Sequence, residues 1–115
     1  MDKLQILDEP IQTTAYQDLW RTFKPGIDVI PINGEPATAG SAALLRYEPG
    51  ATVPEHLHKD VEYIFVLSGS QVDENGHHKA GSLVVNDKDT IHSVISHEGC
   101  IVLAIWCGNL EMLKN

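Results

Sequence analysis

The stretch PGATVPEHLHKDVEYIFVLSG, residues Pro49–Gly69, places two histidines one residue apart and a glutamate four residues later, directly before an apolar run. Side chains alternate between the two faces of a strand, so residues of one parity share a face. His56 and His58 therefore point to one side, and Glu62 joins them if the chain stays extended through the three residues between. The next two even-numbered positions, Ile64 and Val66, are apolar. This pattern predicts a strand with a polar entrance and a buried continuation.

The three polar side chains are of the types that bind divalent metals. Neutral imidazoles and carboxylates are good ligands for borderline ions, and three ligands leave coordination positions open. A fourth histidine from another strand would still leave room for water or substrate. His92 fits best because it lies in the apolar segment TIHSVI, whereas the other histidines lie in a loop or beside a turn. The alternative is that these are polar residues on an exposed sheet face.

The rest of the chain reads as short strands separated by turn residues, which is typical of an all-β sandwich or barrel. A tight hairpin is expected at Asn75-Gly76, because both residues tolerate positive φ. The predicted strands cover residues 27–32, 41–48, 61–68, 82–85, 90–95 and 100–106.

Residues 1–26 differ from this pattern and are predicted to form an N-terminal arm, with the barrel covering residues 27–115. The segment TTAYQDLWRTF suits a short amphipathic helix with Leu19, Trp20 and Phe23 on one side, or an extended arm. Pro25-Gly26 ends it. Such an arm is a candidate for packing across a dimer.

Composition bounds the class of protein. The 115 residues suit one domain, and the formal net charge of −8 disfavours nucleic acid as a partner. No apolar run is long enough to span a membrane, and the acidic N-terminus lacks signal-peptide features, so a cytoplasmic location is expected. Cys100 and Cys107 would lie roughly 23 Å apart on an unbroken strand, too far for a disulfide.

The spacing of Gly50, His56, His58, Glu62 and Gly69 resembles the first motif of the cupin superfamily at every marked position. The second motif is matched in part. Gly81 and His92 stand for its glycine and histidine, but Asp87 and Asp89 replace the usual proline and glycine, and Ser96 replaces the closing asparagine.

Within that superfamily, residues 41–106 resemble the cupin-like domain of the ChrR type. The resemblance implies a single-domain jelly-roll β-barrel with a divalent metal at His56, His58, Glu62 and His92. In the anti-sigma factor of that name the domain follows a zinc-binding anti-sigma domain. A chain of this length leaves no room for that domain, and residues 1–24 hold no histidine or cysteine, so anti-sigma activity is not expected.

Two functions follow from the ligand set. The first is a small metalloenzyme, with dioxygenase-like chemistry on a small organic molecule. The alternative is a metal-dependent module that binds or senses a ligand or oxidant without turnover. The ligands accommodate Zn, Fe, Mn or Ni. No further catalytic signature stands out: Tyr63 has the opposite parity to Glu62 and should face away, and Trp106 suits the core or a pocket wall. A homodimer is expected, because the exposed edge of a small barrel needs covering.

Overall fold

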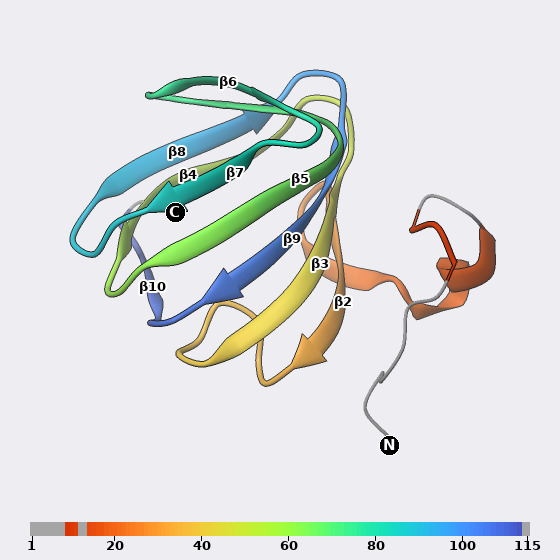
Figure 1. Cartoon of the computed structure of the whole chain (residues 1–115), viewed down its shortest axis with the longest axis horizontal. Coiled ribbons are helices and arrows are strands. Elements are labelled where there is room, and N and C mark those ends of the chain that lie inside the picture. Colours follow the sequence, from red (N-terminus) through yellow and green to blue (C-terminus); the bar gives the residue numbers. More distant parts are fainter. Residues whose placement is uncertain (1–8, 12–13, 114–115) are drawn as a thin grey trace.

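The structure, a computed structural model, describes residues 9–11 and 14–113 as one curled antiparallel sheet (Figure 1). The strands run in the order β1-β2-β3-β9-β5-β8-β4-β10, and β6 and β7 also pair with β5. Their bounds are β1 Arg21–Lys24, β2 Ile27–Asn33, β3 Ser41–Tyr47, β4 Ala51–His58, β5 Glu62–Asp73, β6 Gly76–Lys79, β7 Leu83–Asn86, β8 Ile91–Ser96, β9 Cys100–Trp106 and β10 Leu110–Met112. The all-β prediction is confirmed, and β10 is a strand that the sequence did not predict.

Strand β5 joins the two halves of the curled sheet. Its first half pairs with β7 and β9, and its second half pairs with β6 and touches β8. The register with β9 shifts between Val66 and Ser68, and Gly69 follows with a φ of 72°. A bulge and a left-handed glycine bend a strand sharply, so the chain can leave one layer and enter the other.

The main core lies between these two halves. Alternation along the strands turns one set of side chains inward, among them the fully buried Val66, Val102 and Ala104. A smaller cluster of Tyr16, Ile30 and Leu44 packs on the outer side of β2 and β3.

The N-terminal segment contributes to that outer cluster. Where the sequence left a helix and an extended arm open, the chain forms a short 3₁₀ helix, η1 (Thr14–Leu19), followed by the edge strand β1. Residues 1–8 and 12–13 of the predicted arm lie outside the described residues, as do residues 114–115 at the other end. Within the described chain, no helix is long and apolar enough to cross a membrane.

Candidate metal centre

The four predicted ligands converge inside the barrel. His56 and His58 come from β4, Glu62 from the first position of β5, and His92 from β8. Their potential ligand atoms all lie within 4.8 Å of one another, and none of the four residues is more than 6% exposed. The ring centroids of His56 and His58 are each 4.6 Å from that of His92. The alternative of an exposed polar face is therefore wrong.

A bulge at Pro54 sets which side chains of β4 point inward. Ala51 and Val53 are buried at odd positions, but the register with β8 shifts between Val53 and His56, and from there the even positions are buried. Proline lacks the N–H that a regular ladder needs, so it suits a bulge. Beyond the bulge, His56 lies directly opposite His92 in the β4–β8 pair.

Parity placed Glu62 beside the histidines on the condition that residues 59–61 are extended, and this condition is wrong. The chain does not stay extended after His58: β4 ends there, residues 59–61 bend, and Glu62 begins a different strand. The bend is held by the Asp60 carboxylate, which accepts a hydrogen bond from the Val61 amide at 2.7 Å. Glu62 reaches the histidines across the barrel interior rather than along one strand face.

The three imidazoles are held in one tautomer by oxygen acceptors. Their Nδ1 atoms lie 2.9 Å from the Pro54 carbonyl for His56, 3.0 Å from the Thr90 carbonyl for His58, and 3.2 Å from the Asp73 carboxylate for His92. Because oxygen only accepts in these contacts, each Nδ1 carries the hydrogen and each Nε2 keeps a free lone pair.

The Nε2 atom of His58 is a buried polar atom without a hydrogen-bond partner among the described residues. It lies 3.1 Å from Glu62 Oε1, yet the pair lacks hydrogen-bond geometry. A buried polar atom without a partner costs about 1–3 kcal/mol. A divalent ion accepting the three Nε2 lone pairs and the carboxylate would satisfy it, so the donor set fits a metal.

The turn between β7 and β8 holds His58 through its backbone as well. The Asp89 amide donates to the His58 carbonyl at 2.7 Å, and the His58 amide donates to the Thr90 carbonyl at 2.9 Å. Asp89 has a φ of 69° at the position where the cupin motif usually has glycine. Aspartate tolerates this conformation better than most residues, so the departure from the motif keeps the turn.

Glu62 is held by both of its cross-strand neighbours. Asn86 of β7 donates to Oε1 at 2.9 Å, and the indole of Trp106 of β9 donates to Oε2 at 2.7 Å. Burial alone would raise the pKa of Glu62, but the contact with His58 and the nearby imidazoles hold that pKa below its ordinary value. The group is therefore an anion, the form in which a carboxylate can bind a metal. Burial also lowers the pKa of His56, which favours the neutral form.

Sequence reasoning missed Asp73, Asn86 and Thr90 as site residues. It placed Trp106 in the core or a pocket wall, which the structure confirms, but did not foresee its hydrogen bond to Glu62. Asp73 also contacts His78 Nε2 at 2.8 Å, so it links a half-buried histidine to His92. Burial raises the pKa of Asp73, but hydrogen bonds from His78, the Asn75 amide and His92 outweigh this effect and leave the pKa lowered. Each of these residues contacts a partner that is distant in the sequence, so no local spacing pattern indicates its role.

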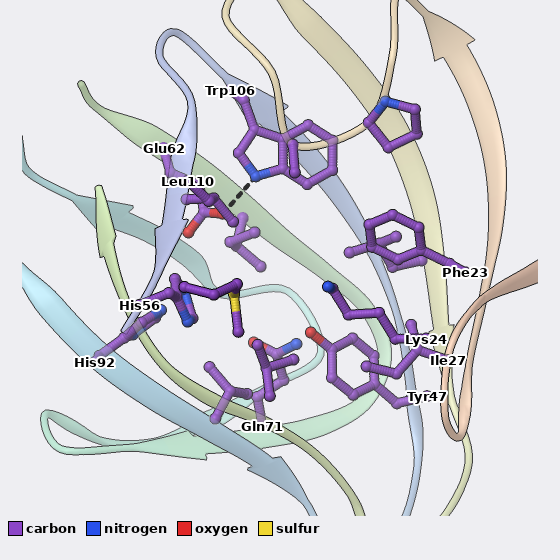
Figure 2. A pocket seen from close by; sticks show the side chains of 17 residues that line it. Phe23, Lys24, Ile27, Tyr47, His56, Glu62, Gln71, His92, Trp106 and Leu110 are labelled. Carbon is purple, nitrogen blue, oxygen red and sulfur yellow. Dashed lines mark hydrogen bonds between the residues drawn. The ribbon is translucent and has the colours of Figure 1, made fainter. Parts of the chain in front are cut away.

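The site opens into a cavity of about 230 Å³ (Figure 2). His56, Glu62 and His92 line it, and most of the remaining wall is apolar. Such a cavity beside convergent polar groups is typical of a small-molecule site. Tyr63 is 36% exposed and faces away from the cavity, as its parity predicted. Cys100 and Cys107 are free thiols.

Comparison with known proteins identifies relatives of this domain. A family model described as the ChrR Cupin-like domain matches residues 8–107. The anti-sigma-E factor ChrR of Cereibacter sphaeroides is 34% identical over 89 residues, which are 74% of this chain and 40% of that protein. A second protein of that organism, DddL, is named as a candidate dimethylsulfoniopropionate lyase and is 31% identical over 72 residues, 59% of this chain and 31% of its own. The chain thus spans less than half the length of both relatives.

Among solved structures, an acetylacetone dioxygenase from Acinetobacter johnsonii superposes with a TM-score of 0.77. The match covers 100% of this chain and 84% of that one, at 15% sequence identity. This likeness establishes the fold, and it confirms the single-domain jelly-roll barrel that the resemblance to the cupin superfamily implied.

Proposed function

The chain belongs to the ChrR cupin-like domain family, and from that premise we propose that it is a small metalloenzyme acting on a small organic molecule. His56, His58, Glu62 and His92 would hold the divalent ion. The observation that carries the proposal is the buried, partnerless Nε2 of His58 among three imidazoles and a carboxylate. The ion would act as a Lewis acid or, if redox-active, bring dioxygen and substrate together.

The chain's own residues supply the rest of the site. Asn86 and Trp106 fix the carboxylate of Glu62, so its orientation does not depend on the ion. The apolar wall of the cavity excludes water and strengthens electrostatic interactions with whatever binds there. A dioxygenase-like reaction is our first candidate, supported by the ligand set. The relative named as a lyase supports an enzymatic function for this chain, but it does not support a dioxygenase reaction.

The alternative function is a module that binds or senses a small ligand or oxidant without turnover. The 34% identity to an anti-sigma factor favours it, since that protein is named for regulation rather than catalysis. The same metal and the same cavity would serve both functions.

Metal analysis and oxygen consumption separate these functions. Protein purified without added metal should hold close to one divalent ion per chain. Portions loaded with Fe²⁺ or Zn²⁺ are then tested for oxygen uptake with diketones, catechols and thiols. Uptake with Fe²⁺ but not Zn²⁺ supports the enzyme, and ligand binding without uptake supports the sensor. A chain that holds no metal under any loading condition contradicts both.

Asp73 should tune the metal through His92. We expect Asp73→Asn to weaken metal binding about 10–100-fold, because a neutral amide is a poorer acceptor for His92 Nδ1 and makes the ring less basic. Competition against a chromophoric chelator measures the affinity. The exposed Asp18→Asn is the matched control and should bind like wild type. Equal affinity in both variants would mean that Asp73 has no influence on the site.

We also propose that a second copy covers the outer face of β5, β7 and β9. Five apolar side chains there are 36–61% exposed: Tyr63, Phe65, Leu83, Val85 and Ile105. They are contiguous, because Tyr63 lies opposite both Val85 and Ile105, and Phe65 lies opposite Leu83. Among the described strands β7 pairs only with β5, so its other edge is free to pair with its own copy about a twofold axis.

Light scattering tests this interface. The wild-type chain should have twice the mass of one chain, and Leu83→Glu should reduce it to one. A monomeric wild-type chain would rule out the homodimer.

A further inference from the structure

Three polar side chains line the cavity away from the metal ligands. Lys24 of β1 and Tyr47 of β3 come from one half of the sheet, and Gln71 comes from the second half of β5. His56 and His92 belong to the β4–β8 pair on the other side. Figure 2 shows Lys24 reaching into the cavity toward the Tyr47 hydroxyl, with His56 and His92 across from them. The cavity therefore has two polar ends separated by apolar wall.

Lys24 brings an uncompensated positive charge to this end. It is half-buried, and no ion pair involves it among the residues that the structure describes. Its Nζ lies 5.2 Å from the ring centroid of Phe23, a contact that favours a cation but does not neutralise it. Glu62 is the one carboxylate on the described cavity wall, and its two oxygens are already engaged by Asn86 and Trp106.

Tyr47 and Gln71 add hydrogen-bond donors beside Lys24. Tyr47 is 7% exposed, and burial raises the pKa of its phenol well above the ordinary value, so the group is a neutral donor. The Gln71 side chain, 5% exposed, also lines the cavity and opposes that rise in pKa. The Tyr47 hydroxyl lies in the cavity beside the Lys24 ammonium (Figure 2), where it can donate a hydrogen bond to a ligand. This end thus offers an ammonium and a hydroxyl donor.

We propose that the cavity takes a small organic carboxylate, with its anionic group at Lys24 and Tyr47 and its body along the apolar wall toward the histidines. This inference rests on the proposed function, which places a divalent ion at the histidine end of the cavity. A divalent ion with one carboxylate ligand leaves that end with a positive charge, and Lys24 adds a second. Apolar walls strengthen both fields, so an anion is favoured and a cation is excluded.

The size of the cavity limits the ligand. Its volume of about 230 Å³ is several times the ~30 Å³ that a water molecule takes up in the liquid. A carboxylate with a backbone of a few carbons fits, whereas a nucleotide or a peptide does not.

Two matched pairs of probes test the charge preference. 4-Oxopentanoate is compared with hexane-2,5-dione, and 5-oxohexanoate with heptane-2,6-dione, so that within each pair a carboxylate is replaced by a neutral group of the same size. Titration calorimetry on the metal-loaded protein measures binding. We expect at least one carboxylate to bind about tenfold or more tightly than its neutral partner, as a hydrogen bond to a charged group implies.

Substitutions at position 24 assign the preference to Lys24. Lys24→Met should remove the tenfold preference and leave binding of the diketone unchanged, and Lys24→Arg should restore the preference because it keeps the charge. The exposed Lys88→Met is the control and should behave as wild type. An equal affinity for both members of both pairs, or a preference that survives in Lys24→Met, overturns the inference.

Metal content measured on the same samples keeps the two proposals distinct. Lys24 is not one of the four ligands, so Lys24→Met should hold as much metal as wild type. Full metal content without a carboxylate preference defeats the inference alone. A carboxylate preference that depends on Lys24 in a chain holding no metal defeats the proposed function alone.

Discussion

A His58→Ala variant will bind divalent metal at least about 100-fold more weakly than the wild-type chain. Loss of a supporting group beside a ligand costs 10–100-fold, and loss of the ligand itself costs more. His58 is fully buried and fixed by four contacts with the 87–90 turn. Among the described residues the cluster has no fifth potential ligand to take its place. Chelator competition with Zn²⁺ measures the affinity.

Thermal unfolding gives an independent readout of the same variant. A ligand that binds only the folded chain stabilises it by about 2.7 kcal/mol at a concentration of 100 times Kd. Added Zn²⁺ should therefore raise the Tm of the wild type and leave that of His58→Ala nearly unchanged. His77→Ala is the control, because His77 is exposed on β6 and lies outside the cluster. Full metal occupancy in His58→Ala would remove His58 from the ligand set.

The alternation of apolar and polar residues predicted much of this fold, because buried and exposed side chains alternate along the regular parts of the strands. From Glu62 to Val66 the even positions of β5 are buried and the odd positions exposed, as the sequence indicated. The pattern fails where the backbone departs from a regular strand. Pro54 inverts the parity of β4, and the bend at 59–61 moves Glu62 to a new strand. Both are changes in backbone direction that hydropathy does not record.

The groups that support the ligands could not be predicted for a different reason. Asn86 and Trp106 reach Glu62 because β7 and β9 pair with β5 in one register, across 24 and 44 residues of chain. Asp73 reaches His92 across 19 residues. Register between distant strands is set by the packing of the whole barrel. A single sequence therefore marks the candidate ligands through their motif and leaves the residues that hydrogen-bond to them unmarked.

The final prediction concerns Gly69, which closes the first motif where β5 passes between the two halves of the sheet. Its φ of 72° is costly for other residues, and a Cβ there would overlap the Gly99 carbonyl oxygen and lie 2.8 Å from Cys100 Cα. These are backbone atoms of the strand start that pairs with Gly69, so they cannot yield without breaking the β5–β9 ladder. Gly69→Ala should therefore destabilise the fold by about 3 kcal/mol or more.

Gly50→Ala separates steric overlap from backbone strain. Gly50 has a φ of 87°, but an added Cβ would meet nothing within 4 Å, so this variant carries strain alone and should cost about 1 kcal/mol. Urea midpoints of the two variants give the comparison. Equal losses of stability in the two variants would mean that the backbone moves to relieve the overlap at position 69. Glycine would then be needed there only for its positive φ. A much larger loss at Gly69 would show that the motif keeps this glycine so that β9, which carries Trp106 to Glu62, can pack directly against β5.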